Sequence, residues 1–282
     1  MNPSSLENET IREFVRTRYG AVAEQAGADC GCGPSCCSTA PEEPGCCGDS
    51  RCDAGEGKPA SYGEKLGYTA EELAAVAPGA DLGRGCGNPL ALASIKPGET
   101  VLDLGSGAGF DCFLAARQLA GTGRVIGVDM TAAMITKARA NATKGPHRNV
   151  EFRLGEIEAL PVADASVDLI LSNCVINLSP EKERVFREAA RVLKPGGRLA
   201  IADIVATLPL PDAIREKLAA IGACVGGAAL VDDLRAMLAT AGFGRVEVTL
   251  RENSRTLINE WTDHGDAGKF VVSALITASK PR

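Results

Sequence analysis

Cysteine is the residue type in this 282-residue chain that most plainly points to chemistry. There are 11 cysteines; seven of them lie between residues 30 and 52, and the others are Cys86, Cys112, Cys174 and Cys224. An exported protein could use them as disulfides, whereas a reducing cytosol favours metal or redox chemistry. Because the chain has only 2 histidines, any metal site would consist mostly of sulfur, and thiolate ligands select soft ions.

The cysteine-rich stretch over about residues 27–59 has no hydrophobic periodicity, which is typical of a loop. Its cysteines form C-x-C, C-x-x-x-C and two adjacent Cys-Cys pairs. Structural zinc sites favour C-x₂₋₄-C pairs that are well separated in sequence. Three interpretations therefore stay open: a zinc site, the capture and delivery of a soft ion, and a segment without either role.

A regular alternation of strand and helix begins at about residue 100. Apolar runs predict strands over 100–105, 124–129, 150–155, 167–173, 198–206, 245–250 and 270–279. Helical spacing predicts helices over 7–25, 111–120, 131–143, 181–193, 212–224 and 231–241. The first five strand runs lack polar alternation, as expected of a parallel sheet covered on both faces. We divide the chain into a helix and cysteine-rich loop (1–60), a cofactor-binding domain (61–206) and a small substrate section that completes the sheet (207–282).

A glycine-rich turn follows the first of these strands in the run LDLGSGAGFD. Glycines let the backbone turn tightly and approach a ligand at a helix N-terminus. The spacing is G-x-G-x-G, unlike the G-x-G-x-x-G of nicotinamide enzymes. Asp103, before the glycines, suits a cationic ligand group, and Asp129, at the end of the next strand, is placed to bind ribose hydroxyls. The alternative is that both carboxylates only cap helices.

The fourth strand ends in SNCVINLSP, which places Asn173 and Cys174 at the ligand-binding edge of the sheet. A cysteine is a poor general base but a good ligand for a soft ion. Cys86 and Cys224 are flanked by glycines that indicate close-approaching turns, so both could meet Cys174. The alternative for a single cysteine is a small buried hydrophobe, which is what we expect of Cys112.

Four motifs resemble those of class I S-adenosylmethionine methyltransferases, namely LDLGSGAGFD, GVDM, GEIEALPVAD and RVLKPGGRL. The resemblance implies an α/β fold with a Rossmann-like seven-stranded sheet whose last strand is antiparallel. It also implies that S-adenosyl-L-methionine is the cofactor. The resemblance implies that the methionine end contacts Asp103, Gly105, Ser106 and Gly107, the ribose Asp129, and the adenine Met130, Ile157 and Glu158. From its place at the end of the fourth strand, we expect Asn173 to lie near the transferable methyl group.

Longer stretches resemble the arsenite S-adenosylmethionine methyltransferases, among them LGRGCGNPLALASIKPGETVLDLGSGAGFDC and SNCVINLSPEKERVFREAARVLKPGG. This resemblance implies that Cys86, Cys174 and Cys224 hold trivalent arsenic, supplied as arsenite or methylarsenite. It further implies a redox cysteine nearer the N-terminus. Seven cysteines compete for that role, and we favour Cys36 or Cys37. A thiol reductant such as thioredoxin or glutathione would then reset the enzyme.

Charge and hydropathy bear on the other classes of protein. The net charge of -6 gives no electrostatic footprint for nucleic acid or an anionic membrane. Without an apolar run of about 18 residues or a signal-like N-terminus, we expect a cytoplasmic protein, and without a surplus apolar helix face, a monomer. A methyltransferase of small organic acceptors would need an aromatic-lined pocket, which 4% aromatic residues fit poorly. A non-enzymatic metalloid sensor or scavenger would leave the cofactor motifs unused, and antimonite or a selenium species stays open as acceptor.

Overall fold

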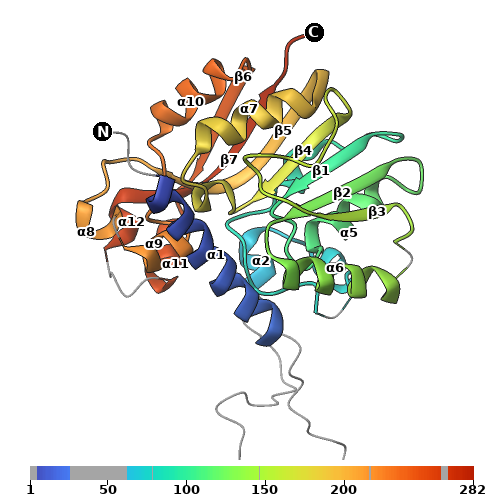
Figure 1. Ribbon diagram of the computed structural model, residues 1–282, viewed down its shortest axis with the longest axis horizontal. Coiled ribbons are helices and arrows are strands. Elements are labelled where there is room, and N and C mark those ends of the chain that lie inside the picture. Colours follow the sequence, from blue (N-terminus) through green and yellow to red (C-terminus); the bar gives the residue numbers. More distant parts are fainter. Residues whose placement is uncertain (1–4, 26–61, 78, 146, 216, 262–265) are drawn as a thin grey trace, which may run out of the picture.

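A single seven-stranded sheet forms the centre of the molecule (Figure 1), with strand order β3-β2-β1-β4-β5-β7-β6. The computed structural model describes residues 5–25, 62–77, 79–145, 147–215, 217–261 and 266–282. Strand β7 runs antiparallel to β5 and β6, and the other neighbouring pairs are parallel. This topology confirms the predicted fold class. The strands are β1 (Thr100–Leu104), β2 (Arg124–Asp129), β3 (Val150–Leu154), β4 (Val167–Asn173), β5 (Leu193–Ala206), β6 (Gly244–Arg251) and β7 (Val271–Ser279).

Helices cover both faces of the sheet, as the apolar strands require. The helices α4 (Leu90–Ala93), α5 (Phe110–Gln118) and α6 (Ala132–Lys144) pack on one face, and α7 (Lys182–Val192) and α10 (Val231–Thr240) on the other. No helix in the described ranges is both long and apolar enough to cross a membrane. The remaining helical elements are α1 (Ser5–Gln25), α2 (Tyr62–Leu66), α3 (Ala70–Ala74), the 3-10 turn η1 (Ile176–Leu178), α8 (Asp212–Arg215), α9 (Leu218–Gly222), α11 (Ser254–Trp261) and α12 (Ala267–Phe270).

The central strand β1 shows why this sheet is stable. Alternate side chains of a strand point to opposite faces, so Leu102 and Leu104 join the core under α7 and α10, while Val101 joins the core under α5. All three are buried. The hydrophobic effect therefore acts on both faces of β1, and the polar ligand-binding groups are left for the loops at its carboxyl end.

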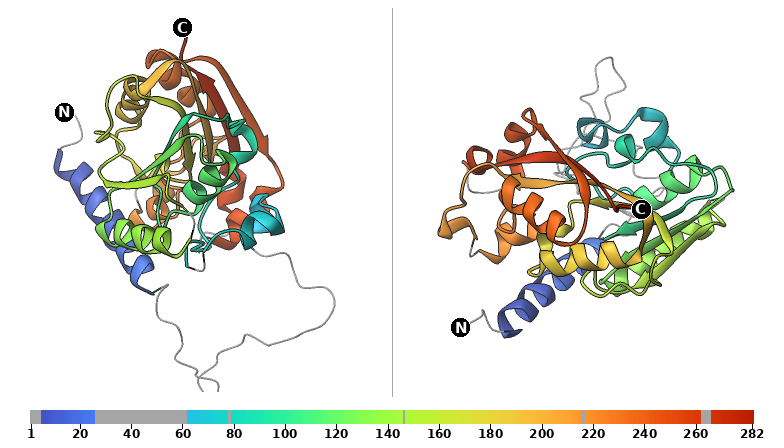
Figure 2. Two further views of the ribbon diagram at one scale, coloured as in Figure 1. Left: turned by 90° about the vertical axis from the view of Figure 1, so that its right-hand side faces the viewer. Right: turned by 90° about the horizontal axis from the view of Figure 1, so that it is seen from above.

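Helix α1 crosses the carboxyl edge of the sheet and lies against α6, α9 and η1 (Figures 1 and 2). Ion pairs fix its first half, because Arg12 contacts Glu158 and Glu181, and Arg16 contacts Glu156 at 2.5 Å. Further along, Lys137 Nζ of α6 donates to the Ala23 carbonyl at 3.2 Å. The helix is thereby a fixed wall of the site rather than a free N-terminal arm.

The predicted helix over 212–224 is the clearest difference between expectation and structure. The described residues form two short helices there, α8 and α9, and Cys224 follows in a turn. Val225 N and Gly226 N both donate to the Ala220 carbonyl, at 3.0 and 2.9 Å, which ends the helix before Cys224. Strands β6 and β7 belong to the same sheet as β1–β5, and the division at residues 60 and 206 stays a prediction.

Candidate active site

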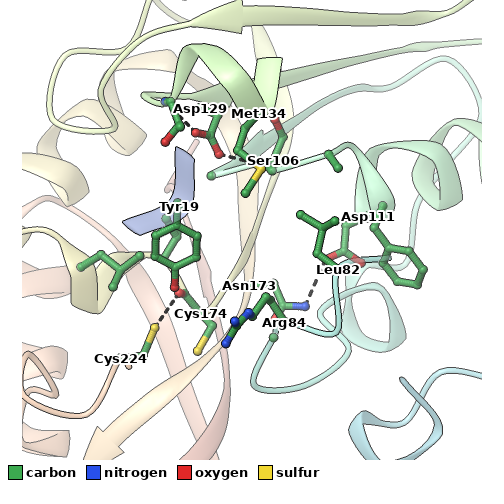
Figure 3. Close-up of a pocket in the computed structure, with 18 of the residues that line it drawn as sticks. Tyr19, Leu82, Arg84, Ser106, Asp111, Asp129, Met134, Asn173, Cys174 and Cys224 are labelled. Atoms are coloured by element: carbon green, nitrogen blue, oxygen red, sulfur yellow. Dashed lines mark hydrogen bonds between the residues drawn. The ribbon is translucent and has the colours of Figure 1, made fainter. Parts of the chain in front are cut away.

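One cavity of about 310 Å³ lies at the carboxyl ends of β1, β2 and β4, under helix α1. Figure 3 shows its two chemically distinct ends, with Ser106 and Asp129 at one and Cys174 and Cys224 at the other. We refer to these as the cofactor end and the thiol end. All 3 tyrosines of the chain line this cavity, although the composition pointed to a pocket poor in aromatic groups.

The glycine turn forms the floor of the cofactor end. Gly105, Gly107 and Gly109 all have positive φ, at 67, 51 and 97°, a conformation that costs other L-residues about 1–2 kcal/mol. Gly105 N donates to the Val128 carbonyl at 2.8 Å, so the turn bends over β2. A Cβ at Gly105 would overlap the Val175 side chain, and that position therefore has no room for a larger residue.

Ser106 is buried, and its Oγ has no hydrogen-bond partner among the described residues. A buried hydroxyl without a partner is costly, and a polar ligand in the cavity that Ser106 lines would satisfy it. Ser106 thus lies in the cavity wall with a hydroxyl that a bound ligand can satisfy, and its contact with the cofactor stays a prediction.

Asp129 ends strand β2 and makes two local hydrogen bonds. Its Oδ2 accepts from Gly107 N at 3.0 Å and its Oδ1 from Thr131 N at 2.8 Å. Thr131 directly precedes α6, so the capping interpretation describes part of what this carboxylate does. It also lines the cavity, where its remaining lone pairs can accept from hydroxyls.

Two buried carboxyl groups, Asp103 and Asp111, lie at the cofactor end. Burial raises the pKa of Asp103 well above its ordinary value, and the charge of Asp111 raises it further. Burial likewise raises the pKa of Asp111 to about 6, although hydrogen bonds with Tyr68 and Asn173 counteract this. A bound cation would lower both pKa values. The pair suits the positively charged ammonium and sulfonium groups of the predicted cofactor.

Cys112 combines two roles of which the sequence predicted only one. It is fully buried in the core beside Phe113 and Ala115, as expected of a small hydrophobe. Its Sγ also donates to Asp103 Oδ2 at 3.2 Å. Cys112 is therefore part of the support of the cofactor end and lies apart from the other three described cysteines.

The predicted adenine contacts also reach the cavity. Met130, Ile157 and Glu158 all contribute to its wall. Glu158 Oε1 accepts from Ser179 Oγ at 2.5 Å and lies 3.6 Å from the Arg12 guanidinium. These bonds leave Ile157 and Met130 as the apolar surfaces on which a flat ring can lie.

The structure brings three of the predicted cysteines together at the thiol end. The Sγ atoms of Cys86, Cys174 and Cys224 all lie within 4.8 Å of one another. Cys86 and Cys174 are paired as a disulfide with a Cα–Cα separation of 5.4 Å, and Cys224 Sγ donates to the Cys174 carbonyl at 2.9 Å. Cys36 and Cys37 lie outside the described residues.

Cys174 and Cys224 both adopt the left-handed backbone conformation, with φ of 57 and 62°. Such a conformation is uncommon for residues other than glycine and clusters at functional sites. It turns the chain sharply at the end of β4 and after α9, so that both sulfurs enter the cavity. Burial raises the pKa of the Cys224 thiol, and the Asp203 carboxylate raises it further.

Side chains from distant elements hold the loop of Cys86 in place. Asn173 Oδ1 accepts from Cys86 N at 3.0 Å, and Asn173 Nδ2 donates to the Gly87 carbonyl at 2.9 Å. Ser273 Oγ of β7 donates to the Cys86 carbonyl at 2.5 Å, and Tyr62 Oη to the Gly85 carbonyl at 2.9 Å. Asn173 lines the cavity as predicted, but its polar atoms position the neighbouring loop.

Asn177 of η1 holds the turn of Cys224 in place. Its Nδ2 lies within hydrogen-bonding distance of Asp203 Oδ1, the Ile204 carbonyl and the Cys224 carbonyl, at 2.9, 2.5 and 3.3 Å. Asp203 is buried, and burial raises its pKa to about 7. The sequence analysis did not identify either residue, although Asn177 lies in the motif SNCVINLSP and Asp203 in the predicted strand over 198–206.

Sequence reasoning also missed Tyr19, Tyr68 and Asp111. Tyr68 Oη donates to Asp111 Oδ1 at 2.7 Å, which fixes the carboxylate that faces the cofactor end. The one available signal was the position of Asp111, directly after the glycine turn. Tyr19 and Tyr68 come from segments before the sheet, and nothing in their spacing shows that they meet the cavity.

The strand order, the glycine turn after β1 and the cavity at the carboxyl ends of the parallel strands define a class I S-adenosylmethionine-dependent methyltransferase. A family model described as a methyltransferase domain matches residues 95–242. The arsenite methyltransferase of Halobacterium salinarum is 53% identical over 273 residues, which cover 97% of this chain and 67% of that protein. This chain belongs to the arsenite methyltransferase family.

More distant relatives agree with this assignment. The human arsenite methyltransferase is 39% identical over 152 residues, or 51% of this chain and 40% of the human protein. The crystal structure of an arsenic(III) S-adenosylmethionine methyltransferase from Chlamydomonas reinhardtii matches with a TM-score of 0.58 and 31% identity, covering 80% of this chain and 75% of that one. This chain thus spans two thirds of the halobacterial relative and less than half of the human one.

Proposed function

We propose that this enzyme transfers the methyl group of S-adenosylmethionine to trivalent arsenic held by Cys86, Cys174 and Cys224. The observation that carries the proposal is the convergence of three cysteine sulfurs within 4.8 Å at the cavity that the glycine turn and the acidic pair also line. Thiolates favour soft ions. In the described part of the chain, neither a histidine nor a carboxylate belongs to this cluster.

Binding of arsenite would begin with the exchange of its hydroxyl groups for thiolates. Each exchange forms one arsenic–sulfur bond, breaks one arsenic–oxygen bond and releases one water. The fixed turns at Cys174 and Cys224 hold the sulfurs ready for this exchange, so little conformational entropy is lost on binding. Methylarsenite, which already carries one carbon substituent, would occupy two of the three thiolates.

When bound, S-adenosylmethionine supplies an electrophilic methyl group on a positively charged sulfur. Asp103 and Asp111 would bind the cationic amino acid portion, Asp129 the ribose, and Met130, Ile157 and Glu158 the adenine. Thiolate-bound trivalent arsenic keeps a lone pair, so methyl transfer needs no general base. The protein then contributes orientation and exclusion of water, two effects that can supply several kcal/mol.

The product of the transfer is formally pentavalent arsenic, and a second methylation requires its reduction. Two thiolates can supply the two electrons by forming a disulfide, and Cys86 and Cys174, whose Cα atoms are 5.4 Å apart, are close enough to form one. An external thiol system such as thioredoxin or glutathione would reduce the disulfide again. Cys36 or Cys37 would take part in this redox cycle, and we propose that the enzyme works as a monomer.

The decisive test is arsenic speciation by liquid chromatography with mass detection. Full-length enzyme is incubated with arsenite and a thiol reductant, with and without S-adenosylmethionine. We expect methylated arsenic only when the cofactor is present. Absence of methylated arsenic, in enzyme shown to bind the cofactor, would refute the proposal; antimonite would then be tested as acceptor. Tight arsenite binding without transfer would favour a scavenger.

A further inference from the structure

Tyr19 lies at the thiol end of the cavity and takes no part in the chemistry proposed above. It lies on α1, and Figure 3 shows its hydroxyl directed at the sulfur of Cys224, with which it forms a hydrogen bond. The same hydroxyl also donates to the Gly222 carbonyl at 3.4 Å, so its proton is shared between this oxygen and the sulfur. Its ring lines the cavity, so the hydroxyl is presented to the one cysteine of the cluster that is free of the disulfide.

The thiol of Cys224 has two hydrogen-bond partners. As a donor it contacts the Cys174 carbonyl at 2.9 Å, and as an acceptor it faces Tyr19. Loss of the thiol proton breaks the first of these bonds and strengthens the second, because a charged acceptor forms a stronger hydrogen bond. Tyr19 is thus placed to favour the sulfur in the form that binds arsenic.

Several charged groups face the Cys224 sulfur. The Asp203 carboxylate from β5 opposes ionisation of the thiol, whereas Lys182 from α7 and Arg18 from α1 favour it. Burial raises the pKa of the Tyr19 hydroxyl above its ordinary value, and the positive charge of Arg84 only partly counteracts this. Tyr19 therefore stays protonated and remains a hydrogen-bond donor over the physiological range.

We propose that Tyr19 is a positioning residue for arsenite capture, whose hydroxyl holds the Cys224 sulfur while this cysteine replaces the last hydroxyl group on arsenic. This inference rests on the proposed function. In the step, the arsenic–sulfur bond forms as the arsenic–oxygen bond breaks. The proton that Cys224 released on ionisation and the hydroxide that leaves arsenic together make one water, Tyr19 keeps its own proton, and no oxidation state changes.

The position of α1 explains why a tyrosine on this helix can act with precision. Arg12 and Arg16 hold the helix to Glu158, Glu181 and Glu156. Five residues before Tyr19, Phe14 packs so closely on Gly222 that a Cβ added to Gly222 would lie 2.9 Å from the Phe14 ring. The hydroxyl is therefore held by the fold and does not have to be ordered when arsenite arrives.

The experiment compares the rate of arsenite binding in reduced full-length wild type and Tyr19→Phe across pH 6–9. Near-ultraviolet absorbance of the arsenic–thiolate bonds is followed by stopped flow. We expect Tyr19→Phe to bind arsenite about tenfold more slowly at pH 7, the usual scale of one hydrogen bond to a charged group. Its rate profile should shift to higher pH by about one unit, and Tyr19→Gln, which keeps a donor, should recover part of the loss.

Two controls separate this role from a structural one. Phe14→Leu loosens the packing of α1 without touching the Cys224 sulfur, and its pH profile should match that of wild type. In a Cys224→Ser background, Tyr19→Phe should change the rate by less than about twofold, because a double-mutant cycle reports only the interaction between the two side chains.

The outcomes are distinct. An unchanged profile in Tyr19→Phe, or an equal loss in the Cys224→Ser background, would overturn the inference while leaving arsenite methylation by wild type intact. Failure of wild type to methylate arsenite would instead refute the proposed function. A shifted profile that disappears in the Cys224→Ser background would establish the role of Tyr19.

Discussion

The two ends of the cavity are built in different ways. At the cofactor end, a strand, a turn and a helix that are contiguous in sequence carry the site, and the turn places its positive φ angles on glycines. At the thiol end, three loops separated by 88 and 50 residues meet, and two of their positive φ angles fall on cysteines, Cys174 and Cys224. The cofactor end is thus specified by a local motif, whereas the thiol end depends on bonds between distant segments.

The largest effect is expected from the sulfur ligands themselves. Cys174→Ser and Cys224→Ser each remove one thiolate, and we expect arsenite methylation to fall by about 100-fold or more. The affinity for S-adenosylmethionine, measured by calorimetry, should stay within about threefold of wild type. A parallel loss of cofactor affinity would show that the two ends are not separately built.

Gly105 is the place where the two ends touch, since a Cβ there would strike Val175, the residue after Cys174. Gly105→Ala should weaken cofactor binding by about 30-fold, or about 2 kcal/mol, and slow arsenite binding as well. Gly107→Ala is the matched control, because its φ is 51° but a Cβ meets nothing within 4 Å. Gly107→Ala should weaken cofactor binding by only about 1 kcal/mol, because it adds backbone strain without a clash.

Asn177→Ala tests the long-range bonds of the thiol end. The change removes the amide donor that Asp203 Oδ1 and the carbonyls of Ile204 and Cys224 share, so the free energy of unfolding should fall by about 1–3 kcal/mol. Arsenite affinity should fall about tenfold, with cofactor affinity unchanged. Asn149→Ala removes a comparable bond to the Gly123 carbonyl at the amino-terminal edge of the sheet, and arsenite affinity in this control should match wild type.

The smallest effect concerns the pH dependence of stability. Burial raises the pKa of Asp203 from 3.8 to about 7, so between these values the folded state keeps a proton that the unfolded state has lost. Stability from this group therefore falls as pH rises from about 4 to 7. In Asp203→Asn, the decrease in melting temperature between pH 5 and 7.5 should be smaller than in wild type. An equal decrease would assign the slope to other groups, such as Asp111.

The same contrast explains what the sequence could predict. The strands, the glycine turn and the positions of Asp103 and Asp129 follow from local patterns, and the strand predictions agree with the structure within a few residues except at the start of β5. The meeting of Cys86 with Cys174 and Cys224 was suggested by flanking glycines and by family resemblance.

Other parts of the site could not be predicted. Tyr68 contacts Asp111, 43 residues away, and Asn177 and Tyr19 contact Cys224, 47 and 205 residues away. No periodicity in the sequence encodes such contacts. The break between α8 and α9 was also missed, because the hydrophobic spacing continues through a turn that only the backbone bonds to Ala220 define.

Asn173 gives both ends of the cavity a common anchor, since one amide bonds to Asp111 at 3.1 Å and to the backbone on either side of Cys86. A cation bound at Asp111 alters the charge that this amide feels, and arsenic bound at Cys86 alters the loop that it holds. The affinities for the two substrates then form a closed thermodynamic cycle. If bound S-adenosylmethionine changes the dissociation constant of arsenite by a given factor, bound arsenite must change that of S-adenosylmethionine by the same factor.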